Sequence, residues 1–193
     1  MAKALLSRLL WPLARLTRTL GAKWVALWSF ARLRESLATP LHASNVILGT
    51  VAVEGTANIR IGRNARIYPG VLLETQGAGR IFIGDNVVLS RGVHIVAFDA
   101  VTLGDNCMVG EYASLRDANH KRSAVSMRDS GHACAAIHLD RNVWVGRGAC
   151  VLQGVHIGAN SIVGANAVVT RDVASSSCAV GVPARARLLS FSV

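Results

Sequence analysis

Charged residues are scarce in this chain of 193 residues, at 17% of the composition, and aromatic residues make up only 5%. A hydrophobic content of 51% beside so little charge is typical of a packed globular fold, which excludes an intrinsically disordered chain. Nucleic-acid binding needs a basic surface with interleaved aromatic side chains, and the repeats described below lack one. We therefore expect no nucleic-acid partner.

Cysteine is also rare, and its spacing matches no metal-binding pattern. The chain contains four cysteines, which are Cys107, Cys134, Cys150 and Cys178. None of them forms a CxxC pair or another zinc-ligand spacing. We interpret them as reduced thiols, and we expect a cytoplasmic protein.

The chain has no apolar run that is long and uncharged enough to cross a membrane, and residues 1–40 come closest. A spanning helix needs about 20 mostly apolar residues, whereas seven basic residues interrupt this stretch. The same charges argue against a signal peptide, in which they would be confined to the start. At 100° per residue one helical face carries leucines and the opposite face carries arginines, namely Leu5, Leu9, Leu13, Leu16 and Leu20 against Arg8, Arg15 and Arg18. We therefore predict a basic amphipathic helical extension over residues 1–40.

Two interpretations of this extension remain open. Arginine on one face, and leucine with Trp11, Trp24 and Trp28 on the other, is typical of a helix that lies in the interface of an anionic membrane. The other interpretation is a helix that caps the domain or packs between chains, with a solvated basic face. The first places the protein on the inner face of the membrane, and the second leaves it free in the cytoplasm.

From Leu139 onward the sequence repeats every six residues. An aliphatic residue begins each of six consecutive hexads, at Leu139, Val145, Val151, Ile157, Val163 and Val169. A period of six fits neither the 3.6 of a helix nor the 2 of a simple strand. It is typical of a hexapeptide β-helix, in which each hexad forms one face of a triangular coil. The sequence therefore predicts an all-β solenoid.

The same repeat, less regular, extends back to about Ile47 and is interrupted once. Residues 121–138 carry no repeat, and we predict an extruded loop there, since loops of this length in compact folds are usually functional. The hexads correspond to about five to six coils. We expect a single repeat domain over residues 41–193, with residues 175–193 capping its open end.

A family resemblance is carried by the segment NVWVGRGACVLQGVHIGANSIVGANAVV and by the later TRDV and AVGVPAR. These segments resemble the C-terminal signature of the hexapeptide-repeat O-acetyltransferases, which include galactoside, maltose, nodulation, xenobiotic and exopolysaccharide-cluster acetyltransferases. The resemblance implies a left-handed parallel β-helix, a homotrimer, and acetyl-CoA bound in the groove between neighbouring chains. It also implies acetyl transfer to a sugar hydroxyl in polysaccharide or lipid-linked glycan biosynthesis.

In that family the catalytic base is a histidine just before the extruded loop, in an Asp-x-Asn-His context, and the match here is His120 in RDANH. Imidazole suits the task because it can remove and return a proton near neutral pH. Asp117 either orients the substrate or the imidazole, or caps the turn. Asn119 either binds the acceptor or forms the turn. Ser90 stands where the sugar acetyltransferases have an acceptor-binding asparagine, and this departure leaves the acceptor unspecified.

For acetyl-CoA the resemblance implies a set of residues from the second half of the chain, which are Trp144, Arg147, Ala165, Thr170, Arg171 and Arg185. Guanidinium groups suit the CoA phosphates. A small residue at position 165 allows the pantetheine arm to approach the backbone. Trp144, at an outward position of its hexad, packs either on the pantetheine or on a neighbouring subunit.

Three other functions are weighed against this one. A zinc hydratase of the γ-carbonic-anhydrase type needs three histidines including a His-x4-His pair, and the spacing of His132, His138 and His156 provides none. We interpret these histidines, with His94, as surface residues and expect no metal. A serine acetyltransferase would carry a much longer helical N-terminal domain. A non-catalytic trimeric scaffold would not bind CoA.

Overall fold

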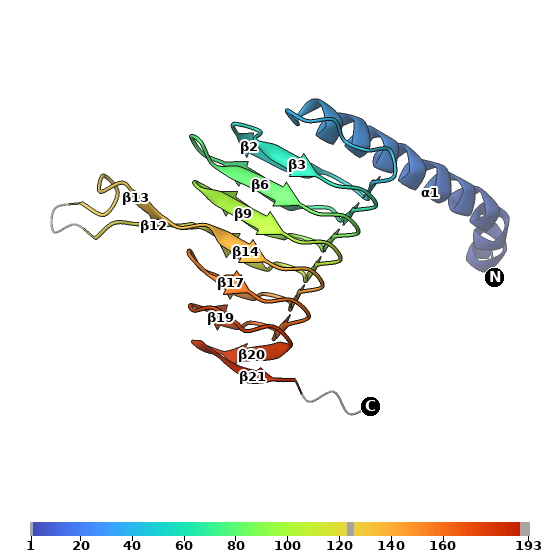
Figure 1. The fold of residues 1–193 in the computed structure, drawn as a ribbon. Helices are drawn as coiled ribbons and strands as arrows, with labels where there is room; N and C mark the ends of the chain where they lie inside the picture. Colours follow the sequence, from blue (N-terminus) through green and yellow to red (C-terminus); the bar gives the residue numbers. More distant parts are fainter. Residues whose placement is uncertain (1, 123–125, 190–193) are drawn as a thin grey trace.

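The structure is a computed structural model, and it describes residues 2–122 and 126–189. One long helix, α1 (Ala2–Glu35), is followed by a stack of short parallel strands that coil into a prism with three faces (Figure 1). The predicted β-solenoid with an N-terminal helix is confirmed.

Each face of the prism is one sheet, and successive strands along the chain move from sheet A to sheet B to sheet C. Sheet A contains β1 (Val46–Ile47), β4 (Arg66–Ile67), β7 (Val88–Leu89), β10 (Met108–Val109), β15 (Trp144–Val145), β18 (Ile162–Val163), β20 (Ser177–Gly181) and β21 (Ala184–Leu188). Sheet B contains β2 (Val51–Gly55), β5 (Val71–Thr75), β8 (His94–Ala97), β11 (Ser114–Arg116), β16 (Cys150–Val151) and β19 (Val168–Val169). Sheet C contains β3 (Ile59–Ile61), β6 (Arg80–Ile83), β9 (Ala100–Leu103), β14 (Ile137–Leu139) and β17 (His156–Ile157).

The hexad anchors form the core of the prism. Residues one coil apart stack in register, so that Leu139 lies beside Ile157 and Val145 beside Val163. All six anchors from Leu139 to Val169 are at most 1% exposed, as the period of six predicts. The corner between sheets C and A turns through residues with positive φ of 56–60°, which are Asn64, Asn86, Asn106, Asn142 and Asn160. Asparagine adopts this left-handed conformation more readily than most other residues.

The prism is longer than predicted. Sheet A has seven parallel strands, β1 to β20, so the chain makes between six and seven coils, and the expectation of five to six is wrong. The missed positions are Val173, which bridges to Ile157, and Ala179 in β20. Val173 follows Val169 by four positions instead of six, and this shortened spacing ends the regular hexads. Within the expected cap, β20 continues sheet A and β21 folds back antiparallel to it, while residues 190–193 lie outside the described part.

The extruded segment is a β-hairpin. It leaves the prism where sheet B would turn into sheet C, between β11 and β14, and its limbs are β12 (Ala118–His120) and β13 (His132–Cys134). Residues 123–125 of the predicted loop lie outside the described part. In Figure 1 the hairpin projects from the side of the stack, away from α1.

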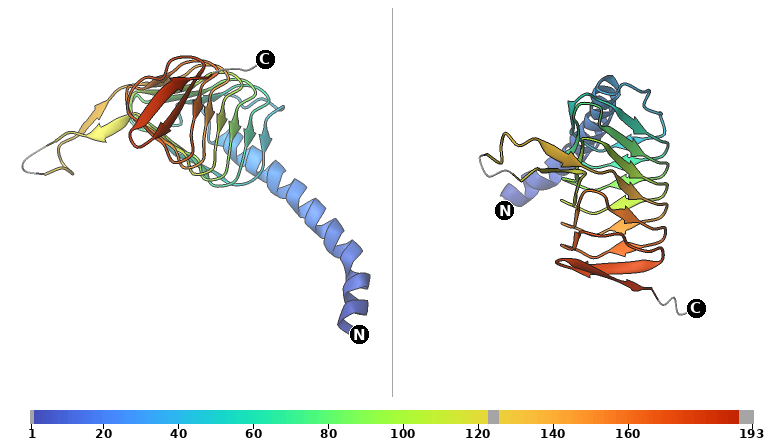
Figure 2. Two further views of the ribbon diagram at one scale, coloured as in Figure 1. Left: turned by 90° about the horizontal axis from the view of Figure 1, so that it is seen from below. Right: turned by 60° about the vertical axis from the view of Figure 1, so that its left-hand side comes forward.

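Only the last turns of α1 pack on the prism. Leu33 is 1% exposed, and this end of the helix contacts β1 and β2. The earlier turns project into solvent (Figures 1 and 2) and expose large apolar side chains at Leu6, Leu10, Trp11, Leu13, Leu16, Leu20, Trp24, Leu27 and Trp28. In the described ranges, 2–122 and 126–189, no helix combines the length and apolar content that a membrane crossing requires.

The two faces of α1 differ from the prediction at one residue. The guanidinium of Arg15 lies 5.5 Å from the ring centroid of Trp11, so Trp11 belongs to the basic face, and its placement among the leucines is wrong. Trp24 and Trp28 stack with centroids 6.5 Å apart. The side chains of Leu5 and Leu9, in the predicted stripe, lie outside the described part.

All four cysteines are free thiols, as the sequence analysis predicts. Cys107 is a packing residue of the core, and its thiol donates a hydrogen bond of 3.0 Å to the carbonyl oxygen of Asp140. Burial raises the pKa of the Cys107 thiol to about 11, so this side chain is protonated and unreactive at neutral pH.

Candidate active site

The predicted catalytic residues lie at the B–C corner, which we define as the segments that link sheet B to sheet C. The hairpin leaves the prism here, and its first limb carries Asp117, Asn119 and His120 at or beside β12. Two coils further toward the C-terminus the same corner carries Thr170 and Arg171, directly after β19. All five side chains except Asp117 are exposed.

Asp117 is buried at the base of the hairpin, with 0% exposure. Its Oδ1 accepts a hydrogen bond from the backbone N–H of Phe98 and its Oδ2 one from that of Asp99, both 2.8 Å long. Its carbonyl oxygen accepts the N–H of Ala135 at 2.9 Å. Of the alternatives left open by the sequence, the structure shows the turn-capping one, and within the described residues the carboxylate makes no hydrogen bond to His120. Asp117 therefore ties both limbs of the hairpin to the coil before it.

His120 lies in a stack of three rings. It pairs with His132 across the hairpin, and the two imidazole centroids are 4.4 Å apart. The ring of Phe98 lies 4.5 Å from the centroid of His132. The pairing of His132 with His120 is not predictable from the sequence, because the loop has no repeat that fixes the register of the hairpin.

The two candidate acceptor residues lie apart. Asn119 is exposed and pairs with Ala133 in the hairpin, at the B–C corner. Ser90 directly follows β7, at the opposite edge of sheet B, where its N–H donates to the carbonyl of Val109. One chain does not bring these two residues together.

The A–B corner, where sheet A turns into sheet B, carries two of the predicted cofactor residues. Arg147 and Ala165 are exposed at the same position of successive coils. The guanidinium of Arg147 lies 5.9 Å from the ring centroid of Tyr112. A Cβ on Gly146 would lie 2.7 Å from the amide nitrogen of Ala165, so only glycine fits there. At Gly146 and Ala165 the corner presents backbone and a small side chain, which suits the close approach of a thin pantetheine arm.

Trp144 and Arg185 lie on sheet A. The indole of Trp144 is 48% exposed and stacks in register between Met108 and Ile162. These side chains line a shallow depression of about 420 Å³. Arg185 lies on β21 opposite Val180, at the closed end of the prism. An aromatic ring and free guanidinium groups are chemically suited to the adenine and phosphates of CoA.

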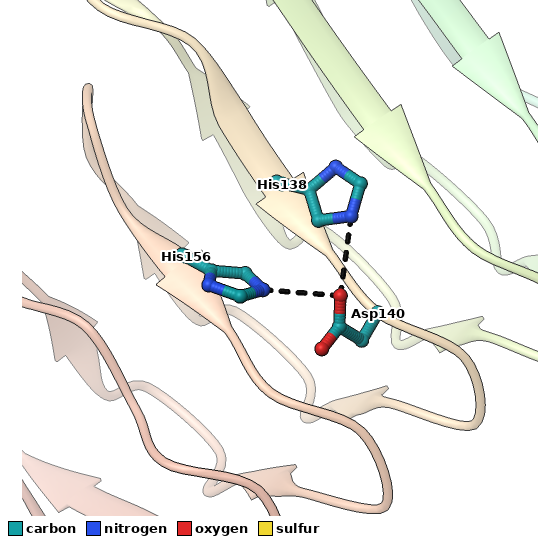
Figure 3. A group of neighbouring side chains, drawn as sticks. All are labelled: His138, Asp140 and His156. Carbon is teal, nitrogen blue, oxygen red and sulfur yellow. Dashed lines mark hydrogen bonds and ion pairs between the residues drawn. The ribbon is translucent and has the colours of Figure 1, made fainter.

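A cluster that the sequence analysis did not predict lies on sheet C. The Nε2 atoms of His138 and His156 lie 3.1 and 3.0 Å from Oδ1 of Asp140 (Figure 3). The hydrogen bond from His156 and the charge of both histidines hold the pKa of Asp140 below its usual value. His138 and His156 are 18 residues apart, which is one full coil, so the period of six contained the signal that would have brought them together.

Comparison with known proteins agrees with this architecture. Residues 136–171 match the family described as bacterial transferase hexapeptide (six repeats). The chain is 30% identical over 176 residues to WbbJ of Escherichia coli (strain K12), which is named for O-acetyl transfer in lipopolysaccharide biosynthesis, and the match covers 85% of this chain and 90% of WbbJ. It is 31% identical to the galactoside O-acetyltransferase of the same strain, over 65% of this chain and 61% of that protein.

Two solved structures extend the comparison. A hexapeptide-repeat acetyltransferase from Vibrio cholerae, complexed with acetyl coenzyme A, superimposes with a TM-score of 0.58 at 25% identity, over 83% of this chain and 76% of that one. A variant of GDP-perosamine N-acetyltransferase from Caulobacter crescentus, complexed with CoA and GDP-perosamine, has a TM-score of 0.57 at 28% identity, over 90% of this chain and 64% of that one. The coiled architecture and the match along nearly all of WbbJ agree with one another, and this chain belongs to the hexapeptide-repeat acetyltransferase family.

Proposed function

We propose that this protein transfers the acetyl group of acetyl-CoA to a hydroxyl group of a sugar, in a glycan or in its lipid-linked precursor. The observation that carries the proposal is the position of His120, exposed at the outer end of β12 in the hairpin that leaves the prism between sheets B and C. The named activity of WbbJ favours an O-linked product and a lipopolysaccharide-type acceptor. The sugar nucleotide bound to the Caulobacter relative also supports a sugar acceptor.

In this proposal the imidazole of His120 accepts the proton of the acceptor hydroxyl. The hydroxyl oxygen then bonds to the thioester carbonyl carbon, and the bond from that carbon to sulfur breaks. The thiolate leaves as CoA after it takes the proton from His120, so the histidine is unchanged at the end of the cycle. Positioned proton transfer of this kind typically contributes about 10²–10⁴-fold to a rate.

His132, Phe98 and Asp117 act as positioning residues. The ring of His132 packs between those of Phe98 and His120, which restricts the imidazole of His120 to few orientations. Asp117 accepts the backbone N–H of Phe98, so it holds the turn on which the rings of His132 and His120 pack. A base that is held in one orientation gives a larger rate enhancement than a mobile base, because less orientational freedom is lost in reaching the transition state.

Arg171 and Arg185 are the proposed phosphate ligands. Both are exposed at the C-terminal end of the prism, and neither forms an ion pair with a carboxylate within residues 2–122 and 126–189. We expect the double change Arg171→Ala and Arg185→Ala to raise the KM for acetyl-CoA at least tenfold, because a charge-assisted hydrogen bond to phosphate contributes about 1.5–3 kcal/mol. Calorimetry with CoA measures the same loss without turnover. Arg141→Ala, an exposed arginine at the corner between sheets C and A, is the matched control, and equal affinity of the double variant and this control would place the phosphates elsewhere.

We further propose a homotrimer in which neighbouring chains share each site. His120 and Arg171 lie at one edge of sheet B, whereas Arg147 and Ala165 lie at the other, and a second chain is the simplest way to bring the two sets together. Sheet A also exposes apolar side chains that a second copy would cover, with Met108 at 47% and Trp144 at 48% exposure on successive coils. Exposed apolar patches of this kind often mark protein interfaces.

Mixed trimers test the shared site. Chains with His120→Ala lack the base, and chains with Arg147→Ala lack the guanidinium of the cofactor edge, where Arg147 and Ala165 lie. We expect each parent trimer to be nearly inactive and co-expressed mixtures to regain activity, since a mixed trimer can pair an intact His120 with an intact cofactor edge. No recovery in mixtures that are shown by tag capture to contain both chains would place the whole site within one chain.

For the exposed part of α1 we propose contact with an anionic membrane surface. The leucine face and the Trp24–Trp28 stack are uncovered in the chain, and the opposite face carries Arg8, Arg15 and Arg18. Membrane contact on the cytoplasmic side would bring the enzyme close to a lipid-linked acceptor. It leaves the packed end of the helix, at Leu33, undisturbed.

Vesicle co-sedimentation measures this contact. We expect full-length protein to bind vesicles that contain anionic lipid, and the change of Arg8, Arg15 and Arg18 to Gln to weaken binding about fivefold per charge at low salt. Removal of residues 2–26 should abolish binding while it retains Leu33 and acetyl transfer to a soluble sugar. If full-length protein stays in the supernatant at low salt, the helix packs on protein instead.

An acceptor screen tests the proposed function itself. Release of CoA thiol from acetyl-CoA is followed with hexose, amino-sugar and nucleotide-sugar acceptors, and with L-serine. We expect release that depends on a sugar and not on serine. Release that depends on serine alone would contradict the proposal in favour of a serine acetyltransferase.

A further inference from the structure

Sheet C carries a polar cluster that acetyl transfer does not use. His138 on β14 and His156 on β17 stand at the same outward position of successive coils, where the coils above carry Arg60, Phe82 and Thr102. Figure 3 shows both imidazoles directed toward the carboxylate of Asp140, which follows β14. This cluster belongs to the outer surface of a sheet, and the hairpin stack of His120, His132 and Phe98 does not include it.

Asp140 replaces a glycine of the repeat. The residue that follows each anchor of sheet C donates its N–H to the anchor carbonyl of the next coil, and it is glycine in the other coils, at Gly62, Gly84, Gly104 and Gly158. In the coil of β14 the position is Asp140, whose N–H makes the same bond, to Ile157, at 2.9 Å. A carboxylate in this column is therefore not needed to build the coil. Asp140 follows β14, which carries His138, and the next strand of sheet C, β17, carries His156.

The three side chains converge with the spacing of metal ligands. Oδ1 of Asp140 lies 3.1 Å from Nε2 of His138 and 3.0 Å from Nε2 of His156, and one ligand atom from each residue lies within 4.8 Å of the others. Tetrahedral zinc, with bonds of about 2.0–2.2 Å, places its ligand atoms roughly 3.3 Å apart. Small rotations of the side chains would therefore admit an ion at the point where the three groups now meet.

A hydrogen bond from the backbone of His156 to Asp172 holds the strand that carries this ligand. The N–H of His156 donates a hydrogen bond of 2.7 Å to Oδ1 of Asp172, which anchors the strand on the side away from His138. Two imidazoles and one carboxylate form the donor set that zinc, cobalt and nickel prefer, whereas magnesium and calcium prefer oxygen ligands alone. His138 and His156 are about half exposed, so an ion can reach the cluster from solvent.

We propose that His138, Asp140 and His156 form a binding site for a divalent transition-metal ion of the zinc, cobalt and nickel class, with these three ligands from one chain and solvent in the remaining position. The site is independent of acetyl transfer, and it does not rest on the function proposed above. It differs from the three-histidine zinc site considered from the sequence, because its third ligand is a carboxylate and His132 takes no part.

Cobalt titration of untagged, full-length protein tests the site after treatment with a chelator. We expect one Co²⁺ per chain and visible absorption bands of the intensity that four-coordinate cobalt gives, and isothermal calorimetry with Zn²⁺ should give the same stoichiometry. The variant Asp140→Gly restores the residue found in the other coils, so it retains the fold while it removes a ligand. It should weaken binding on the order of 100-fold, and His138→Gln should do the same.

His42→Gln is the matched control, since His42 bonds to Ser44 near the first coil, away from the cluster, and its loss should leave cobalt binding unchanged. Circular dichroism and thermal melting confirm that each variant is folded. Binding that survives unchanged in folded Asp140→Gly and His138→Gln, or that His42→Gln weakens to the same extent, would overturn the proposal. Failure of the wild-type protein to bind one equivalent of either ion at micromolar concentration would also overturn it.

Discussion

His120→Ala is expected to lose about 10²–10⁴-fold in kcat, because it removes the group that takes the proton from the acceptor hydroxyl. Affinity for CoA and the assembly of chains should be unaffected, since the imidazole is exposed at the hairpin and contributes little to packing. Steady-state kinetics at saturating acetyl-CoA measure the loss, and calorimetry with CoA measures the retained affinity. Turnover within threefold of wild type would show that another group is the base.

The matched variant is His132→Phe, because two imidazoles lie in the same stack and either could carry the proton. Phenylalanine retains a ring between Phe98 and His120 but cannot titrate. We expect this variant to keep its turnover within about tenfold, with a modest shift in the pH profile. If His132→Phe loses more activity than His120→Ala, the roles of the two histidines are exchanged.

Asp117→Ala is expected to have the largest effect on stability. Each oxygen of this buried carboxylate accepts one backbone N–H, from Phe98 and from Asp99, and the change leaves both donors without partners. A hydrogen bond to a charged group contributes about 1.5–3 kcal/mol, so we expect a loss of about 3 kcal/mol or more. At roughly 2–4 °C per kcal/mol for a protein of this size, the melting temperature should fall by roughly 6–12 °C.

Activity should fall together with stability, since Asp117 anchors the hairpin whose first limb carries His120. Asp99→Ala removes an exposed carboxylate from the same turn but keeps the backbone N–H that Asp117 binds, and it should melt close to wild type. Asp117→Asn keeps one acceptor oxygen but turns an NH2 group toward the other N–H, and we expect an intermediate melting temperature. Equal melting temperatures for Asp117→Ala and Asp99→Ala would contradict the capping role.

The core was predictable residue by residue, because each hexad offers a single inward aliphatic position. Leu139 and Val145 need only the period of six to be placed in the core, and the structure buries both completely. The prediction fails at Val173, which follows Val169 by four positions, and at Ala179, because this one short step moves both residues out of phase with the earlier hexads. The helical pattern does contain the position of Trp11, because 100° per residue turns it away from Leu13 and toward Arg15, where the structure places it.

The candidate site was predictable in part, for reasons that differ between its residues. His120 could be found because it sits at the edge of the loop, in a short local motif. The place of His132 depends on the hairpin register, which no repeat in the loop determines. The role of Asp117 depends on backbone amides of Phe98 and Asp99 in the preceding coil, and backbone donors leave no mark in a sequence.

The chemical bond in the product tests the account most directly. Full-length protein is incubated with acetyl-CoA that carries a labelled acetyl group and with the sugar acceptor that supports CoA release, and the purified product is treated with alkaline hydroxylamine. The account predicts a labelled sugar whose acetyl group is released, because an ester at a hydroxyl is cleaved under these conditions. A label that resists hydroxylamine would reveal an amide at a sugar amine, and it would contradict O-acetyl transfer with His120 as the base for a hydroxyl.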